Sequence, residues 1–93
     1  MEYEIYFTKD FLKSVEKFPS DQRKIIFNKI EYLKNNIGRN SLRIEKLFKG
    51  TKDETRSSSI SMGIRLIWRL DGKWIEIVDV GGHDIYRRYG GKS

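Results

Sequence analysis

Apolar and polar side chains alternate over residues 3–7, YEIYF, which is the repeat of a β-strand with one buried face. From Lys9 onward the apolar residues recur at helical spacing instead, and this predicts an amphipathic helix. Thr8 is suited to cap the start of this helix, and Pro19 ends it, because the residue before a proline is pushed out of the α conformation. The apolar residues expected to enter the core from these two elements are Tyr3, Ile5, Phe7, Phe11, Leu12, Val15 and Phe18.

A second helical stripe follows Pro19. Ser20 offers an N-cap, and Gly38 stands where the glycine that closes a helix is usually found. Between them the apolar residues recur at i, i+4, i+7 and i+11, and Phe27 lies beside this stripe. Residues 9–37 are therefore predicted to form a helical hairpin whose apolar residues belong to the core. The stripe consists of Ile26, Ile30, Leu33 and Ile37.

In the C-terminal half the strand repeat returns. Four segments have β character: 42–48, 55–61, 63–70 and 73–80. Asp71-Gly72, between the last two segments, is a strong hairpin signal, because a type I′ turn needs positive φ at both central residues. A two-residue loop at this dipeptide fixes the register of the hairpin. The expected pairs are Leu70 with Lys73, Trp68 with Ile75, Leu66 with Ile77, and Arg65 with Val78.

This register gives the hairpin two different faces. The apolar face, expected to pack on the helices, carries Leu66, Trp68, Ile75 and Ile77. The mixed face carries Arg65, Arg69, Trp74, Glu76 and Val78, and its arginines suit a phosphate group. The predicted fold class is α+β, with an N-terminal strand and a two-helix hairpin packed on one face of a curled antiparallel sheet of 4–5 strands. Residues 1–93 are expected to form a single domain whose other sheet face stays open.

The composition narrows the classes of function. The chain has 93 residues and a net charge of +6, which favours nucleic acid as a partner and an acidic protein segment as the second candidate. It has no cysteine and one histidine, so disulfides and thiolate metal sites are excluded and no metal or other cofactor is expected. The apolar runs are far shorter than a membrane span, and the N-terminus lacks the pattern of a signal peptide. We therefore expect a cytoplasmic protein without a membrane partner.

The candidate chemistry lies in the mixed face and in the segment after it. The only histidine, His83, follows Gly81-Gly82 at the end of the last predicted strand. A histidine can transfer protons near neutral pH, but a lone loop histidine can equally be an ordinary turn residue. Arg65 could hold a phosphate with two hydrogen bonds or form an ion pair with Glu76. Tyr86 could exchange a proton, stack on a base, or be a core or edge aromatic residue.

Basic residues crowd the segment 39–52, where Glu45 is the only acidic residue. Such a run can steer an RNA backbone into a groove, or it can merely protect an exposed strand edge from pairing. The serines at 57–59 have no companion that would activate a serine nucleophile. The basic residues of the segment are Arg39, Arg43, Lys46, Lys49 and Lys52.

Three segments, in this order, resemble the RelE/ParE superfamily of toxins from bacterial and archaeal toxin–antitoxin systems. They are FTKDFLKSVEKFP, KLFKGTKDETRSSSISMGIRLIWRL and IVDVGGHDIYRRYG, and the resemblance covers nearly the whole chain. RelE-type members are described as endoribonucleases that cut mRNA in the ribosomal A site without a metal. There the ribose 2′-oxygen attacks the adjacent phosphate and leaves a 2′,3′-cyclic phosphate and a free 5′-hydroxyl. The resemblance therefore implies a toxin of this kind, neutralised by a cognate antitoxin protein that binds its basic groove.

The resemblance also implies roles for individual residues. Arg65 would bind the phosphate, His83 would act as base or acid, and Tyr86 would orient the substrate or stack on it. The segment 57–61, SSSIS, departs from the family, whose nucleases often carry several lysines or arginines on this strand. Two alternatives remain open: a ParE-type toxin that binds DNA gyrase, and a degenerate member that only binds nucleic acid or its antitoxin. The further substrate-binding candidates are Lys46, Lys49, Lys52, Arg56, Arg69 and Arg87.

Overall fold

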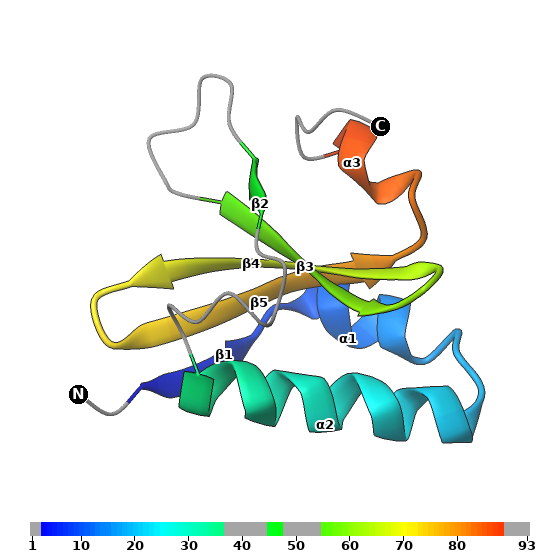
Figure 1. Ribbon diagram of the computed structural model, residues 1–93, viewed down its shortest axis with the longest axis horizontal. Helices are drawn as coiled ribbons and strands as arrows, with labels where there is room; N and C mark the ends of the chain where they lie inside the picture. The colour runs from blue at the N-terminus through cyan, green and yellow to red at the C-terminus, as the bar shows by residue number, and fades with distance from the viewer. Residues whose placement is uncertain (1–2, 37–44, 48–54, 89–93) are drawn as a thin grey trace.

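The computed structural model describes residues 3–36, 45–47 and 55–88 of the chain. The elements, in chain order, are β1 (Glu4–Phe7), α1 (Lys9–Val15), α2 (Ser20–Asn36), β2 (Glu45–Leu47), β3 (Thr55–Ser61), β4 (Ile64–Asp71), β5 (Trp74–Gly81) and α3 (Ile85–Arg88). The described strands form one sheet in the order β1-β5-β4-β3-β2, and α1 and α2 lie along one face of it (Figure 1). The predicted α+β fold class is confirmed, and the last three predicted strands agree with the structure to within one residue at each end. Of the predicted strand 42–48, residues 45–47 are described and form β2.

β1 is an edge strand of this sheet and runs parallel to β5, whereas the other neighbouring strands are antiparallel. The sheet is therefore mixed, and the expectation of a purely antiparallel sheet is corrected at this edge. A parallel arrangement is available to β1 because the chain leaves it into α1 and does not turn back in a hairpin. Thr8 fixes the junction: its N–H donates to the Ile77 carbonyl at 3.1 Å, and its hydroxyl donates to the Val78 carbonyl at 2.7 Å.

Thr8 also caps α1, as predicted. Its hydroxyl oxygen accepts a hydrogen bond from the N–H of Phe11 at 3.1 Å, which satisfies one of the free N–H groups of the first turn. The helix ends at Val15, and a tight turn then leads to Pro19. The short α1 is thus held at its N-terminus by the same residue that ties β1 to the sheet.

The start of α2 differs from the prediction. The carbonyl of Pro19 accepts hydrogen bonds from the N–H groups of Gln22 and Arg23, at 3.0 and 2.9 Å. Because the capping residue is the one whose carbonyl accepts the first helical bond, Ser20 is the first residue of the helix and not its cap. The predicted closing glycine, Gly38, lies outside the described residues, as does Ile37.

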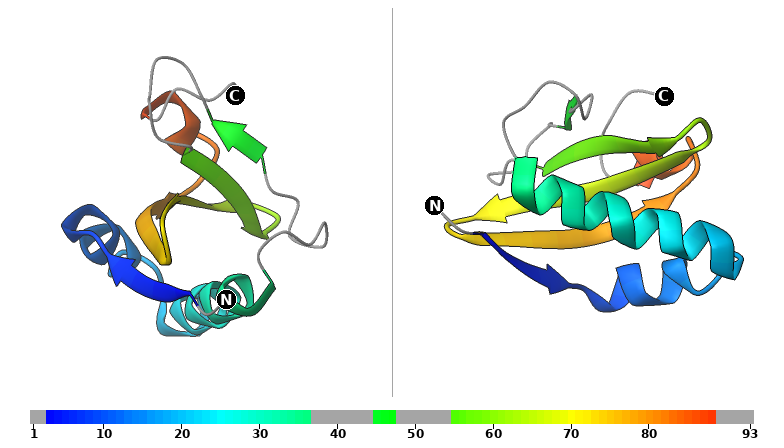
Figure 2. Two further views of the ribbon diagram at one scale, coloured as in Figure 1. Left: turned by 90° about the vertical axis from the view of Figure 1, so that its left-hand side faces the viewer. Right: turned by 60° about the horizontal axis from the view of Figure 1, so that its bottom comes forward.

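The helices and the sheet share one core. It lies between α1, α2 and the sheet face that they cover, an arrangement that Figure 2 shows end-on. The apolar face of the hairpin belongs to this core, as predicted, and so does the α2 stripe as far as it is described. The buried members are Phe11, Val15, Ile26, Ile30, Leu33, Ile60, Ile64, Leu66, Trp68, Ile75, Ile77 and Val80.

Some apolar helix residues that were expected in the core lie at its edge. A helix places consecutive residues about 100° apart, so the neighbour of a buried residue points sideways out of the buried stripe. Phe27 still contributes to packing, since its ring lies edge-on to the rings of Phe7 and Phe11 at centroid distances of 5.8 and 5.9 Å. The exposed fractions are 45% for Leu12, 44% for Ile25, 40% for Phe27 and 41% for Tyr32.

The β4–β5 hairpin turns one residue later than predicted. Its loop is Gly72-Lys73, and Asp71 pairs with Trp74. Gly72, at the first loop position, has a φ of +61°, a conformation that hairpin turns use and that glycine adopts without strain. The predicted pairs near the turn are therefore wrong by two residues along β5. Trp68, for example, pairs with Ile77 and not with Ile75. A shift of two residues leaves every side chain on its face, which is why the predicted faces hold.

A β-bulge interrupts the same pair of strands farther from the turn. The adjacent β4 residues Ile67 and Trp68 pair with Asp79 and Ile77. Val78, between these two partners on β5, is therefore the extra residue of the bulge. Beyond the bulge Arg65 pairs with Gly81, so its predicted pairing with Val78 is wrong by three residues. The bulge brings Arg65 beside the last residue of β5, from which the chain continues to His83.

Candidate functional site

Arg65 and His83 meet at the end of the sheet where β4 begins and β5 ends. Nη2 of Arg65 lies 3.5 Å from Nε2 of His83, although the two residues are 18 positions apart in sequence. Arg65 is the second residue of β4 and is half-buried, whereas His83 lies in the turn after β5 and is exposed. The contact joins the residues that the sequence nominates for phosphate binding and for proton transfer.

Hydrogen bonds from one nitrogen orient the Arg65 guanidinium. Its Nη1 donates to the hydroxyl of Ser59 at 2.9 Å and to the carbonyls of Ser61 and Ile64 at 3.3 and 3.5 Å. Ser59 is the cross-strand partner of Arg65 on β3, and its hydroxyl donates in turn to the Ser61 carbonyl at 3.3 Å. Because Nη1 is held by the β3–β4 hairpin, the Nη2 edge is turned toward the histidine.

The Arg65–His83 contact sets a condition on the histidine. An arginine N–H can only donate, so a hydrogen bond between these atoms requires an unprotonated Nε2, with the ring proton on Nδ1. Once His83 takes up a second proton, both groups are donors, and an anionic oxygen between them could accept from both. The pair can therefore bind a phosphate oxygen and exchange a proton at the same point, as phosphodiester cleavage demands.

The two glycines before His83 differ in how closely they are packed. A Cβ added to Gly81 would lie 3.3 Å from Cδ1 of Ile85, which is tighter than ordinary contact. A Cβ on Gly82 would lie 3.7 Å from the carbonyl oxygen of Gly63, in the β3–β4 turn. Gly81 thus allows α3 to fold back close to the sheet, and the Ile85 N–H closes the turn by donating to the Gly82 carbonyl at 3.0 Å.

α3 covers part of the sheet face that the sequence predicts to be open. Ile85 is buried against Ile67 on β4 and Val78 on β5, on the side of the sheet away from α1 and α2 (Figure 1). The expectation of a wholly open face is therefore corrected. Sequence reasoning missed this helix because a single turn carries one buried apolar residue, too little to produce a repeat.

Two other predicted site residues belong to α3. Arg87 is exposed, and its N–H donates to the Asp84 carbonyl at 3.1 Å. Tyr86 lies in the helix by its backbone, and its side chain is outside the described part of the chain. The structure therefore places Tyr86 three residues beyond His83 on the same short segment.

Arg69 shares a sheet face with Arg65 but is separate from the site. It forms an ion pair with Glu76, its cross-strand neighbour, so the alternative pairing of Arg65 with Glu76 is not adopted. Four residues of strand separate the two arginines by about 13 Å. A cavity of about 440 Å³ lies beside this ion pair, and Tyr6 and Trp74 line it.

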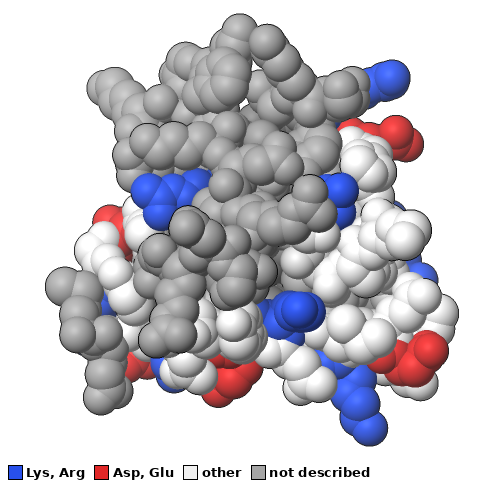
Figure 3. Space-filling model, in the orientation of Figure 1, with Lys and Arg blue, Asp and Glu red and all other residues white. Residues whose placement is uncertain are grey.

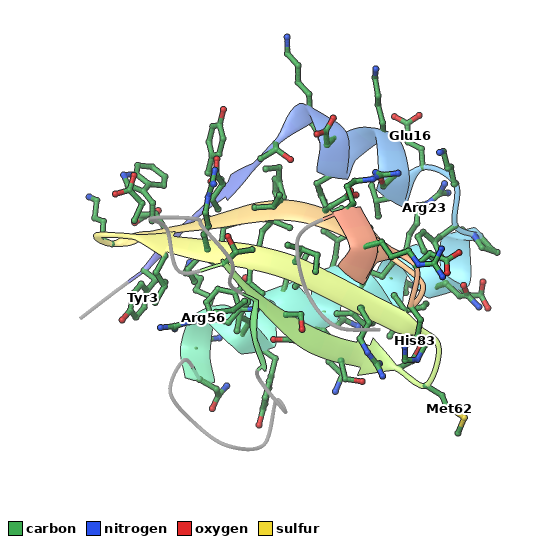
Figure 4. The ribbon with its side chains drawn as sticks, turned by 90° about the horizontal axis from the view of Figure 1, so that it is seen from above. Tyr3, Glu16, Arg23, Arg56, Met62 and His83 are labelled. Atoms are coloured by element: carbon green, nitrogen blue, oxygen red, sulfur yellow. The ribbon has the colours of Figure 1, made fainter. Side chains whose placement is uncertain are left out.

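Arg56 lies on the other face of the sheet from Arg65. It pairs with Trp68 across β3 and β4, and its guanidinium stacks 5.6 Å from the centre of the Trp68 ring system. Figure 4 shows Arg56 and His83 near opposite ends of the sheet, with Met62 of the β3–β4 turn on the side of His83. Arg56, a substrate-binding candidate from the sequence, therefore does not share the sheet face of Arg65.

The predicted basic run is described only in part. Lys46 lies in β2, where its backbone pairs with Arg56, and its side chain is outside the described part. Lys49 and Lys52 lie outside the described residues. Their role in substrate binding stays a prediction.

Of the three serines at 57–59 on β3, Ser59 contacts the candidate site. Ser57 and Ser58 are buried, and Ser58 accepts a hydrogen bond from the Trp68 indole N–H at 2.9 Å. Ser59, on the opposite face, orients Arg65. Sequence reasoning missed Ser59 as a site residue, and only the position opposite Arg65 in the β3–β4 ladder identifies it.

The described residues form no metal centre, and the side seen in Figure 3 shows no continuous basic patch among them. Among the described residues, no three His, Cys, Asp or Glu side chains gather where they could hold a metal ion. No helix of the described ranges is long and apolar enough to span a bilayer. On the side seen in Figure 3, the described lysines and arginines are dispersed, with acidic side chains near several of them. The Arg65–His83 pair is therefore the candidate site that the described residues define.

This strand order, with two helices on one face and the short terminal helix on the other, is the fold of the RelE-like toxins. No protein-family model and no curated protein matches the sequence. Solved structures match the fold over nearly the whole chain, at sequence identities of 16–20%. The resemblance inferred from the sequence is confirmed at the level of the fold.

Three of these structures come from different organisms. RelE of Pyrococcus horikoshii, in complex with RelB, has a TM-score of 0.71 and 16% identity, covering 88% of this chain and 96% of that chain. The E. coli DinJ–YafQ toxin–antitoxin complex has a TM-score of 0.71 and 18% identity, with coverages of 91% and 97%. The YoeB dimer of Staphylococcus aureus has a TM-score of 0.72 and 20% identity, with coverages of 89% and 99%.

Proposed function

We propose that this chain is the toxin of a type II toxin–antitoxin pair and that it cleaves mRNA in the ribosomal A site. The observation that carries the proposal is the 3.5 Å contact between Arg65 and His83 on a RelE-like fold. The net charge of +6 supports it, because a cationic protein is attracted to a target rich in phosphate. Action on the ribosome would place the protein in the cytoplasm.

In the proposed reaction the ribose 2′-oxygen attacks the neighbouring phosphorus. The bond from phosphorus to the 5′-oxygen of the next nucleotide breaks, which leaves a 2′,3′-cyclic phosphate and a free 5′-hydroxyl. Arg65 would stabilise the negative charge that develops on the phosphoryl oxygens in the transition state. The 2′-hydroxyl gives its proton to a base, and the leaving 5′-oxygen takes a proton from an acid.

His83 is our candidate for one of these two proton transfers. Its unprotonated Nε2 would accept the 2′-hydroxyl proton, or its protonated ring would donate to the 5′-oxygen. Tyr86 is our candidate for the second transfer or for stacking on the base. Lys46, Lys49, Lys52 and Arg87 would contact the RNA backbone.

The proposed partner besides mRNA is an antitoxin protein. RelE of P. horikoshii is found with RelB and E. coli YafQ with DinJ, which supports a partner of the same kind for this chain. An acidic segment in that partner would complement the positive charge of the chain.

The test is a cleavage assay on ribosomes programmed with a defined mRNA. We expect wild-type protein to cut the message. His83→Ala is expected to lower the rate by about 100- to 10,000-fold, the usual worth of a positioned acid or base. Arg65→Ala is expected to lower it by about 100- to 1,000-fold, the usual worth of one group that stabilises transition-state charge. Lys24→Ala is the matched control: it removes the same charge from an exposed residue of α2, across the sheet from the site. This control is expected to cut like wild type.

Other outcomes have definite meanings. If both site variants cut like wild type, the site assignment is wrong. Inhibition of DNA gyrase with intact mRNA would favour the ParE-type alternative. An absence of growth arrest on induction in a bacterial host would favour the degenerate member that only binds.

A further inference from the structure

The position of His83 depends on how α3 is attached. α3 has four residues, too few for a helix to be stable by itself in water, so its place is set by contacts with the sheet. One contact is the burial of Ile85 against Ile67 and Val78. The other is an ion pair at the far end of the helix, between Arg88 and Asp79.

Asp79 is a buried carboxylate with its oxygens held in fixed positions. Its side chain is 1% exposed, and it lies on β5 beside the bulge. Oδ1 accepts a hydrogen bond from the N–H of Val80 at 2.8 Å, and Oδ2 accepts one from Nη1 of Arg88 at 3.1 Å. A buried charge is tolerated only where it is paired and hydrogen-bonded, so the bond from Arg88 is one of those that stabilise the Asp79 carboxylate.

The contact closes the segment that carries the proposed proton-transfer groups. Asp79 and Arg88 are nine residues apart in sequence, and both His83 and Tyr86 lie between them. A cavity of about 410 Å³, lined by Lys17 and Phe18 as well as by residues of α3, lies between α3 and the turn after α1. Ile85 fixes the start of α3, and the ion pair fixes its end.

We propose that Asp79 and Arg88 are positioning residues that hold His83 against Arg65, an inference that rests on the proposed function. The guanidinium of Arg65 is held by its own bonds to the β3–β4 hairpin. Loss of the ion pair therefore displaces His83 while the phosphate-binding arginine stays in place. Catalysis then falls much more than substrate binding.

The experiment measures kcat and the half-saturating concentration separately on mRNA-programmed ribosomes. Arg88→Ala is expected to lower kcat by about 10- to 100-fold, since a displacement of the order of 1 Å can cost that much, and to leave the half-saturating concentration nearly unchanged. Arg88→Lys keeps a cation within reach of Asp79 and is expected to restore most of kcat. Lys24→Ala removes the same charge from an exposed residue of α2, across the sheet from the site, and is expected to leave both values unchanged.

Amide hydrogen exchange separates the structural claim from the activity. In Arg88→Ala the amides of residues 82–87 are expected to exchange faster than in wild type, while those of the core strands do not change. If Arg88→Ala lowers Tm too far, Asp79→Asn replaces it, because it keeps the shape of the side chain and its bond from Val80 while removing the charge.

The failures are distinguishable. If wild-type protein cuts no message, the proposed function fails. Unchanged amide exchange at residues 82–87 in Arg88→Ala would overturn the positioning role of the ion pair, whatever the activity. If wild type cuts and Arg88→Ala keeps its kcat, the positioning role is wrong. An equal loss of kcat in Lys24→Ala and Arg88→Ala would assign the effect to charge and also overturn the inference.

Discussion

Ser58 and Ser59 are neighbours on β3, but their side chains lie on opposite faces of the sheet. Ser58 lies on the helix side, where it accepts a hydrogen bond from the buried indole N–H of Trp68. Ser59 lies on the side of α3, where it accepts one from Arg65. Successive side chains of a strand point to opposite faces of the sheet. Ser58 therefore contributes to the stability of the core, and its neighbour Ser59 contributes to the candidate site.

Substitution of each serine by alanine should separate these contributions. Ser58→Ala leaves a buried N–H without its acceptor, and the expected loss in free energy of unfolding is about 1–3 kcal/mol. Ser59→Ala breaks a half-buried bond and should cost less than about 1 kcal/mol, but it lowers the mRNA cleavage rate because Arg65 loses an anchor. Urea unfolding and the ribosome cleavage assay measure the two effects. Equal stability losses would contradict the division.

At the scale of elements, the sequence predicts repeats well and registers poorly. The faces of β4 and β5 follow from alternation, and the α1 cap follows from the chemistry of Thr8. The meeting of Arg65 with His83 depends on two features without a sequence repeat: a loop at Gly72-Lys73, and a bulge at Val78. Each shifts the partners of Arg65, and together they move its partner from Val78 to Gly81. The two site residues could therefore be nominated from the sequence, but their contact could not.

The junction of β1 and α1 provides a test at this scale. Thr8→Ala removes both the cap of α1 and the bond to the Val78 carbonyl, and the expected loss in free energy of unfolding is about 1–2 kcal/mol. Thr8→Ser keeps a hydroxyl able to make both bonds, so its unfolding free energy should stay within about 0.5 kcal/mol of wild type. Thermal or urea unfolding of wild type and the two variants measures these differences in the free energy of unfolding. A loss in Thr8→Ser as large as that in Thr8→Ala would show that the methyl group and not the hydroxyl matters.

For the whole molecule, the count of 19 lysines and arginines overstates the number of cations that can meet RNA. Arg69 is paired with Glu76, and Arg88 with Asp79. Arg56 stacks on Trp68, on the other face of the sheet from the candidate site. Several arginines are thus engaged in contacts within the fold. A count of basic residues from the sequence cannot distinguish these arginines from cations that are available to a ligand.

Salt dependence can distinguish the two kinds of arginine. A cation that contacts phosphate releases counterions on binding, so its loss reduces the slope of log K against log salt by about one. We expect Arg87→Ala to show a change of this size when binding to mRNA-programmed ribosomes is titrated with KCl. Arg69→Ala should change the slope much less, because Glu76 already neutralises this arginine. Equal changes would show that the Arg69–Glu76 pair opens on binding and that Arg69 contacts RNA, as the sequence alone suggested.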